Sequence, residues 1–248
     1  MISVITCTID PLRLELLRST YALAMGDHPW ELVAIRDARS LAEGYTRGIA
    51  ASRGETVIFC HDDIEILSAD FPQRLLRHLE RFDLIGVAGT NRLVGGAWTA
   101  AGPPHLFGQV AHPDSGGFLN INIYGAPARV IGNIQAVDGL FFAVRREMLG
   151  RVAFDPAVFD GFHLYDVDFS FSAYCAGFRL GVACDIQLLH QSLGKYDERW
   201  LAYKERFERK WAGRLGKIVP RRFIWAGVLV GSRAEALEVM NPPYWPGE

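Results

Sequence analysis

Three consecutive polar residues, His61, Asp62 and Asp63, directly follow an apolar run from Thr56 to Cys60. Carboxylate oxygens at the end of a buried strand are ligands that hard cations such as Mg²⁺ and Mn²⁺ prefer. If the chain stays extended here, His61, Asp63 and Glu65 share one face while Asp62 points to the other. Asp63 is therefore the first candidate for a cation ligand. A polar turn after a buried strand is the alternative interpretation.

A second acidic pair, Asp166 and Asp168, lies within apolar residues at helical spacing that end at Gly177. The pattern places both aspartates in the first turn of a helix, where acids also stabilise the helix by accepting bonds from free amides. Residues two apart on a helix point in different directions. We therefore expect one aspartate to cap the helix and the other to do chemistry.

A third polar segment runs from His190 to Lys195 and contains an imidazole, a hydroxyl, a glycine and an ammonium. The glycine and Lys195 suit a diphosphate group, and the imidazole of His190 could complete a cation site begun by Asp63. A purely structural role for this single histidine is the alternative.

Strand and helix patterns alternate along the first 90 residues and position the first polar cluster. Strands are expected at 2–6, 31–35, 56–60 and 84–88, with helices after Asp10 and Ser40 and over 72–82. This order predicts an α/β fold with a mostly parallel sheet, in which ligands bind beyond the carboxyl ends of the strands. The segment from His61 to Asp63 lies at such an end.

The second half of the chain is less regular. Glycine, proline and asparagine are dense from 91 to 135, which indicates a long loop or a hairpin. A strand over 136–145 is interrupted by Asp138 and Gly139, and a glycine inside a strand often marks close approach of backbone or ligand. We expect one catalytic domain over 1–195, with a C-terminal helix and extension over 196–248 packed on it.

Composition bounds the function. The 248 residues are 50% hydrophobic, enough for a substantial core, and 26 basic against 28 acidic residues give a net charge of −2. That balance argues against the broad basic surface that nucleic acid binding requires.

Four cysteines without a close pair favour reduced thiols and a cytoplasmic location. No apolar window reaches the roughly 20 residues of a membrane span, so we expect no transmembrane segment. Peripheral association with the inner face of a membrane stays open.

Taken in order, these motifs resemble the GT-A glycosyltransferases of the family 2-like group. The resemblance covers most of positions 2–195 and rests on five segments: the opening strand, His61–Asp63, Asp138–Arg146, Tyr165–Asp168 and His190. It implies a GT-A, Rossmann-like fold with a mixed, mostly parallel sheet flanked by helices. It also implies metal-dependent, inverting transfer of a sugar from a nucleotide-diphosphate donor, with a UDP-sugar favoured, to a hydroxyl of a glycan or lipid-linked acceptor.

The resemblance also implies a cation site. Asp63 matches the last aspartate of the family's DxD motif, which holds a divalent cation, Mn²⁺ or Mg²⁺, against the donor diphosphate. His190 matches the family's late metal-binding histidine. His61 stands where the first aspartate of the motif usually is and remains a candidate ligand, while Asp62 takes over part of the ribose contact.

The same resemblance implies a base and an acceptor site. Asp166 matches the catalytic base of the family's ED motif, with Tyr165 in place of the usual glutamate and Asp168 as the reserve candidate. Gly139 matches the glycine beside the acceptor, and Asp138 would contact an acceptor hydroxyl.

On the donor side, Thr6, Thr8 and Asp37 match positions that bind the nucleoside, and Thr46 stands where the family usually has asparagine. Lys195 would help to stabilise the leaving diphosphate.

Two other functions compete with this one. A metal-dependent phosphohydrolase would use similar residues but needs a second closely spaced ligand set, which the sequence lacks. A non-catalytic GT-A-like domain that binds nucleotide sugar is suggested by the unusual residues His61 and Tyr165.

Overall fold

The computed structural model describes residues 1–194, 196–217, 227–243 and 245, and its first part alternates strand and helix as predicted. The elements are β1 (Ile2–Cys7), α1 (Pro11–Met25), β2 (Trp30–Ile35), α2 (Leu41–Ala51) and β3 (Thr56–Cys60). Asp10 caps α1 by accepting from the amides of Leu12 and Arg13, and Ser40 caps α2 through the amide of Glu43. β1 pairs in parallel with both β2 and β3. The carboxyl ends of these three strands therefore meet at one edge of a sheet.

The first sheet has the strand order β2-β1-β3-β11-β5-β12-β9. Its further strands are β11 (Phe141–Arg145), β5 (Leu84–Gly86), β12 (Leu180–Ala183) and β9 (Val130–Ile131). β11 is antiparallel to both of its neighbours, while β12 is parallel to β5 and antiparallel to β9. β2, β1, β3, β5 and β12 thus run in one direction, and the predicted α/β fold with a mixed, mostly parallel sheet is confirmed.

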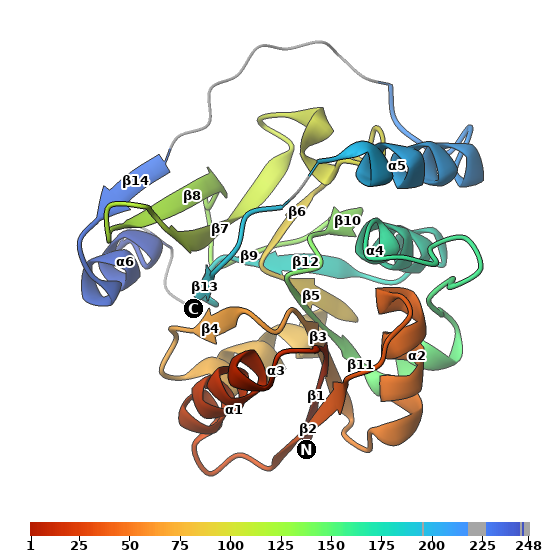
Figure 1. Ribbon diagram of the computed structural model, residues 1–248. Helices are drawn as coiled ribbons and strands as arrows, with labels where there is room; N and C mark the ends of the chain where they lie inside the picture. Colours follow the sequence, from red (N-terminus) through yellow and green to blue (C-terminus); the bar gives the residue numbers. More distant parts are fainter. Residues whose placement is uncertain (195, 218–226, 244, 246–248) are drawn as a thin grey trace.

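Helices flank this sheet on both sides. α1 and α3 (Phe71–Arg81) lie on one side of β1–β3, and α2 lies on the other (Figure 1). An aromatic core fills the α2 side, and in it Phe154 and Phe169 stack with ring centroids 4.3 Å apart. Phe59 packs against both rings, so the end of β3 that carries the polar cluster is held by a rigid apolar base.

A second sheet contains the region for which the sequence predicted a long loop or a hairpin. Its order is β10-β6-β7-β13-β4, and β8 pairs with β7. The strands are β10 (Ala136–Val137), β6 (Ala88–Thr90), β7 (Leu106–Pro113), β13 (Leu188–His190), β4 (Ile64–Ile66) and β8 (Leu119–Gly125). β7 and β8 form an antiparallel hairpin with a register shift at Gly108, where φ is +108°. The hairpin interpretation is therefore correct. The irregular backbone at Gly108 helps to explain why the sequence shows no regular alternation of apolar and polar residues here.

Two predicted single strands, and the largely apolar run over 180–189, are each divided between the two sheets. The expected strand 84–88 becomes β5 and β6, the expected strand 136–145 becomes β10 and β11, and the run 180–189 becomes β12 and β13. Gly89 lies at one of these crossings, where a Cβ atom would collide with the carbonyl oxygen of Ala136. The crossings bring strand ends from both sheets to one region of the molecule.

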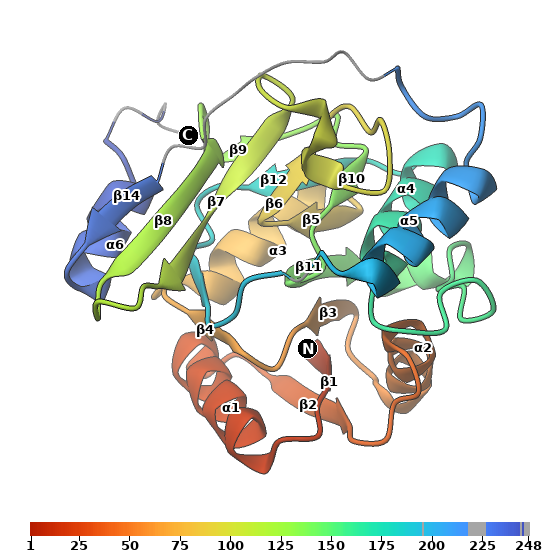
Figure 2. The same cartoon turned by 45° about the horizontal axis from the view of Figure 1, so that its top comes forward.

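The C-terminal elements cover this region and extend the second sheet. α4 (Tyr165–Cys175) and α5 (Glu198–Lys210) lie side by side (Figures 1 and 2). β14 (Gly227–Val230) pairs with β8, next to α6 (Arg233–Met240), as Figure 2 shows. Two short 3₁₀ helices complete the described structure, η1 (Trp98–Ala101) and η2 (Arg146–Gly150). Within α5, the side chain of Phe207 is fully buried.

The four cysteines are free thiols. Within the described ranges, no helix has both the length and the apolar character needed to cross a bilayer.

Candidate active site

Three titratable side chains from distant parts of the chain meet at the carboxyl end of β3. Nε2 of His190 lies 3.2 Å from Oδ1 of Asp63 and 3.3 Å from Nδ1 of His61. One ligand atom from each residue lies within 4.8 Å of the other two. Two imidazoles and a carboxylate form a donor set that fits a divalent cation. The structure thus brings together the three residues expected to hold metal.

Strand pairing explains this convergence. β13 pairs antiparallel with β4, and the register sets His190 opposite Ile64, the residue after Asp63. The amide of Gln191 donates to the carbonyl of Asp63 over 2.9 Å, and the amide of His61 donates to the carbonyl of Leu140 over 3.0 Å. Backbone bonds therefore fix both sides of the cluster before any ligand binds.

The electrostatics of the cluster favour an ionised carboxylate at Asp63 and a neutral imidazole at His61. Burial of Asp63 opposes ionisation, but the hydrogen bond and charge of His190 outweigh it and hold the pKa of this carboxyl well below its usual range. Burial, followed by the charge of His190, lowers the pKa of His61. Neutral imidazole and ionised carboxylate are the forms that bind metal.

His61 also contacts Tyr165, the first residue of α4. Nε2 of His61 lies 3.1 Å from the Tyr165 hydroxyl, which donates to the carbonyl of Gly139 over 3.3 Å. Two of the residues that depart from the pattern of the resembled family are thus in contact with each other.

A cavity of about 290 Å³ opens on one side of the cluster, beyond the ends of β1 and β2. Its lining includes Thr8, Arg13, Asp62 and Asp63 together with apolar residues such as Leu41. The Thr8 hydroxyl donates to Oδ2 of Asp62 over 2.6 Å. Asp62 therefore points into this cavity. Asp62 and Asp63 lie in a turn between β3 and β4, so the expectation that the chain stays extended here is wrong and the alternative of a polar turn describes the backbone.

Arg13 is a residue of this cavity that the sequence analysis missed. Its Nη1 lies 3.4 Å from Oδ1 of Asp62 and 3.8 Å from Oδ2 of Asp63. An arginine in the first turn of a helix is unfavourable for the helix dipole. That mismatch is the signal in the sequence that could have identified Arg13 as a residue with a functional role.

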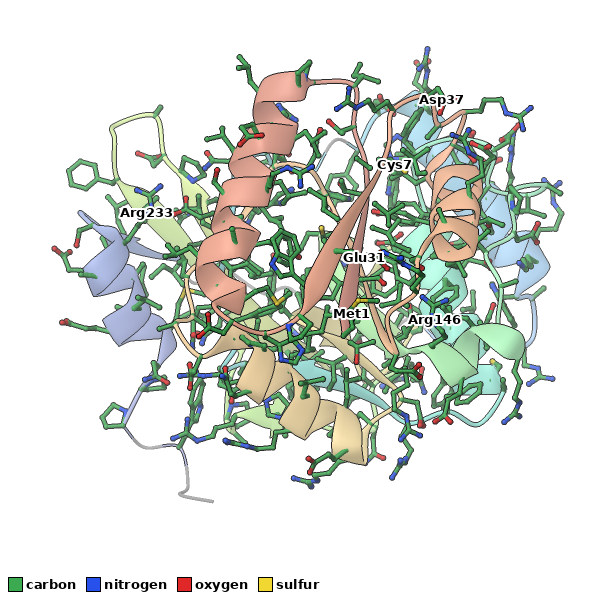
Figure 3. All side chains as sticks on the ribbon, turned by 90° about the horizontal axis from the view of Figure 1, so that it is seen from below. Met1, Cys7, Glu31, Asp37, Arg146 and Arg233 are labelled. Carbon is green, nitrogen blue, oxygen red and sulfur yellow. The ribbon has the colours of Figure 1, made fainter. Side chains whose placement is uncertain are left out.

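Two of the expected nucleoside-binding residues are not directed into the cavity. Thr6 is fully buried within β1, and its hydroxyl has no hydrogen-bond partner among the described residues. The side chain of Asp37 is 79% exposed and forms an ion pair with Arg47. Figure 3 shows Asp37 at the periphery, beyond the end of β1 marked by Cys7. Lys195, the expected diphosphate contact, lies outside the described residues.

A second cavity, of about 310 Å³, opens on the other side of the cluster. Its lining includes Asp138, Gly139 and Asp166, and aromatic residues such as Trp98 and Tyr124. His61 lines both cavities. The cluster therefore stands at the boundary between the two cavities.

Asp166 lies in this second cavity with a perturbed carboxyl group. Burial, together with the neighbouring charge of Asp138, raises the pKa of Asp166 to about 7, against the effect of hydrogen bonds from backbone amides that include Gly139. Asp138 is itself held by Trp98, whose Nε1 donates to it over 2.8 Å, and by the amide of Leu140 at 2.9 Å. A carboxyl group that titrates near neutral pH suits general base catalysis.

The backbone that precedes Asp166 and the backbone that faces its side chain, at Gly139, are both constrained. Leu164 precedes α4 with φ at +61°, a left-handed conformation that costs a non-glycine residue about 1 kcal/mol. A Cβ atom at Gly139 would lie 2.8 Å from both Cβ and Oδ2 of Asp166 and would also collide with the Tyr165 hydroxyl. Glycine is required at this position because the carboxylate occupies the space of a side chain.

Asp168, the reserve candidate for the base, occupies a different environment. Its oxygens accept from Nζ of Lys210 at 2.9 Å and from Nε1 of Trp211 at 2.8 Å, and its side chain is 1% exposed. Among the described residues that line the second cavity, Asp166 is present and Asp168 is not. Asp168 joins α4 to α5, so the expectation that it serves as the base is corrected, because both of its oxygens are engaged in this link.

The model of the glycosyltransferase-like family matches residues 3–212. The chain belongs to that family. Among curated protein sequences, none matches. The predicted family resemblance is thereby confirmed over the part of the chain that carries both cavities.

Two solved structures share the GT-A fold with this glycosyltransferase-like chain. One is the mannosyltransferase PcManGT from Pyrobaculum calidifontis in complex with GDP-Man and Mn²⁺, with a TM-score of 0.52 and 14% identity over 88% of this chain and 66% of that chain. The other is GalNAc-T7 with UDP, GalNAc and Mn²⁺, with a TM-score of 0.51 and 10% identity over 86% of this chain and 48% of that chain. The chain thus spans slightly less than two thirds of the first and about half of the second.

Proposed function

We propose that this protein is a metal-dependent, inverting glycosyltransferase that moves a hexosyl unit from a nucleotide-diphosphate sugar to a hydroxyl of a glycan or lipid-linked acceptor. The observation that carries the proposal is the position of the His61, Asp63 and His190 cluster between two cavities. One cavity offers Arg13 and Asp62, which suit a nucleotide, and the other offers Asp166, which suits an acceptor hydroxyl.

On the donor side, Thr8 and Asp62 would orient the ribose, since their hydrogen bond presents a carboxylate at the cavity wall. Arg13 carries a guanidinium that can donate to phosphate oxygens in a bidentate way. A cation held by His61, Asp63 and His190 would supply the positive charge that offsets charge developing on the leaving diphosphate. We favour a UDP-sugar as donor and Mn²⁺ or Mg²⁺ as the cation.

On the acceptor side, Asp166 would take the proton of the attacking hydroxyl, a contribution of about 10²–10⁴-fold to the rate. Asp138 would fix the acceptor, and Gly139 leaves the space in which Asp166 and the acceptor meet. A base that lies opposite the departing diphosphate gives in-line attack, and in-line attack inverts the anomeric centre.

The proposal is tested by mixing the protein with UDP- and GDP-sugars in the presence of Mn²⁺ or Mg²⁺. Binding raises the melting temperature by mass action, and consumption of the donor is followed by release of nucleotide. We expect at least one nucleotide sugar to stabilise the protein only when a divalent cation is present. Absence of any cation-dependent stabilisation or turnover across the panel would overturn the proposal.

The two competing functions predict other outcomes in the same assay. A phosphohydrolase would consume the donor rapidly without any acceptor, although the described residues offer one metal-binding group and no second set. A non-catalytic domain would bind the nucleotide sugar and leave it intact.

A further inference from the structure

The contact between His61 and Tyr165 determines which nitrogen of His61 faces the cluster. The Tyr165 hydroxyl has one proton, and the carbonyl oxygen of Gly139, 3.3 Å away, can only accept. The hydroxyl can bond to Gly139 and to Nε2 of His61 at the same time only if its proton goes to Gly139 and its oxygen accepts Nε2–H from His61.

The consequence lies at the other end of the imidazole ring. A neutral imidazole that carries its proton on Nε2 has its lone pair on Nδ1. Nδ1 of His61 lies 3.3 Å from Nε2 of His190, inside the cluster that contains Asp63. The hydrogen bond from His61 through Tyr165 to Gly139 therefore prepares His61 as a ligand.

The position of His190 is also prepared. Nδ1 of His112 lies 3.1 Å from the carbonyl oxygen of His190, and because a carbonyl can only accept, this nitrogen carries the proton and donates. Nε2 of His190 has Asp63 and His61 as close partners, with the Ser192 hydroxyl at 3.4 Å. Once Nε2 of His190 gives up the proton that it donates to Asp63, two nitrogen lone pairs and one carboxylate oxygen can be aimed at a single point.

We propose that His61, fixed by Tyr165, makes this a site of two nitrogens and one oxygen that binds first-row transition ions in preference to Mg²⁺. The inference deepens the proposed function and rests on it for the expectation that a divalent cation binds at this cluster. Imidazole favours first-row transition ions, whereas Mg²⁺ demands oxygen ligands and retains water. The affinity order expected for such a site is Co²⁺ above Mn²⁺ and Mn²⁺ above Mg²⁺. Tyr165 is a positioning residue, because it acts on the ion through His61.

The test measures ion binding by the whole chain without donor. Mn²⁺ is titrated and the free ion is followed by electron paramagnetic resonance, and Mg²⁺ or Co²⁺ is then added as a competitor. Outer partners of metal ligands typically change affinity by about 10–100-fold. We therefore expect Tyr165→Phe to weaken Mn²⁺ binding by about 10-fold, and His61→Ala to weaken it at least as much.

Two further variants separate positioning from a general effect on folding. His61→Asp exchanges a nitrogen ligand for oxygen, so the preference for Mn²⁺ over Mg²⁺ should fall by about 10-fold. In a His61→Ala background, Tyr165→Phe should have no additional effect, because its only route to the ion is gone. His28→Ala is the matched control. His28 lies in the turn between α1 and β2, at the opposite end of β1 from the cluster, where the amide of Ile2 bonds to Pro29.

The outcomes distinguish the inference from the proposed function. Equal Mn²⁺ affinity in the unmodified chain and in folded Tyr165→Phe would overturn the inference, and so would competition by Mg²⁺ as strong as that by Co²⁺. Failure of Mn²⁺ to bind the unmodified chain, both alone and with UDP present, would also overturn it. Turnover of a nucleotide sugar with any activating ion would leave the proposed function standing in each case. Transition-ion binding without donor binding would remove the function alone.

Discussion

Asp63, in the turn that precedes β4, and His190, at the end of β13, are in contact, with 3.2 Å between carboxylate oxygen and imidazole nitrogen. β4 and β13 set this distance through their antiparallel register. The contact depends on backbone pairing and on two buried side chains, so its geometry is built into the fold.

The first prediction concerns Asp63. Asp63→Ala removes the carboxylate of the cluster, and we expect cation-dependent donor binding to weaken by at least about 10-fold. Loss of a metal ligand should reduce ion affinity at least as much as loss of a residue that only bonds to a ligand. Calorimetric titration of nucleotide sugar with and without Mn²⁺ measures the effect. Glu65→Ala is a suitable control, since that carboxylate pairs with Arg233 on the surface. Unchanged cation dependence in Asp63→Ala would exclude Asp63 as a ligand.

The second prediction concerns the base. Asp166→Asn keeps the shape of the side chain but cannot accept a proton, so transfer should fall by about 10²–10⁴-fold while donor affinity changes little. Initial rates and donor titration together measure this split. Burial raises the pKa of Asp166, which makes its ionised form unfavourable in the folded state. The variant should therefore be no less stable than the unmodified protein at pH 8, and full turnover would assign the base elsewhere.

The third prediction concerns pH. Because burial and Asp138 raise the pKa of Asp166 to about 7, the base is protonated below that pH and transfer should rise as the pH increases through this range. A bound cation would lower the midpoint. Asp138→Asn removes the neighbouring charge, so the rise should move to lower pH. Rate profiles with saturating donor and cation measure the shift, with the exposed Asp114→Asn as control. A midpoint that moves to higher pH would contradict the coupling of these two carboxyl groups.

The fourth prediction concerns Asp168. Asp168→Asn weakens the bonds to Lys210 and Trp211 in a buried position, and we expect the free energy of unfolding to fall by about 1–3 kcal/mol. Urea denaturation measures the loss, and donor affinity should stay the same. Asp155 also bonds to Lys210 but its side chain is 30% exposed, so Asp155→Asn should cost less than about 1 kcal/mol. Loss of transfer without loss of stability in Asp168→Asn would restore it as a candidate base.

The sequence by itself determined the elements and the edge at which they meet. Apolar periodicity and the caps at Asp10 and Ser40 are local, so β1, α1, α2 and β3 were predicted within a few residues. Parallel order then required the acids after β3 to lie at the carboxyl edge. The sequence analysis also expected His190 to complete a cation site with Asp63, and the structure places these two side chains 3.2 Å apart.

Only the tertiary structure decided which side chains face each other. Their position in the first turn of a helix did not decide between Asp166 and Asp168 as the base. In the structure, Lys210 and Trp211 at the end of α5 donate to both oxygens of Asp168, which therefore lies outside the second cavity. The contact of His61 with Tyr165 depends on how α4 approaches β3. Strands shared between two sheets have no local signature that marks the crossing. Side-chain partners over such long separations are set by the packing of whole elements, and no window of sequence contains both members.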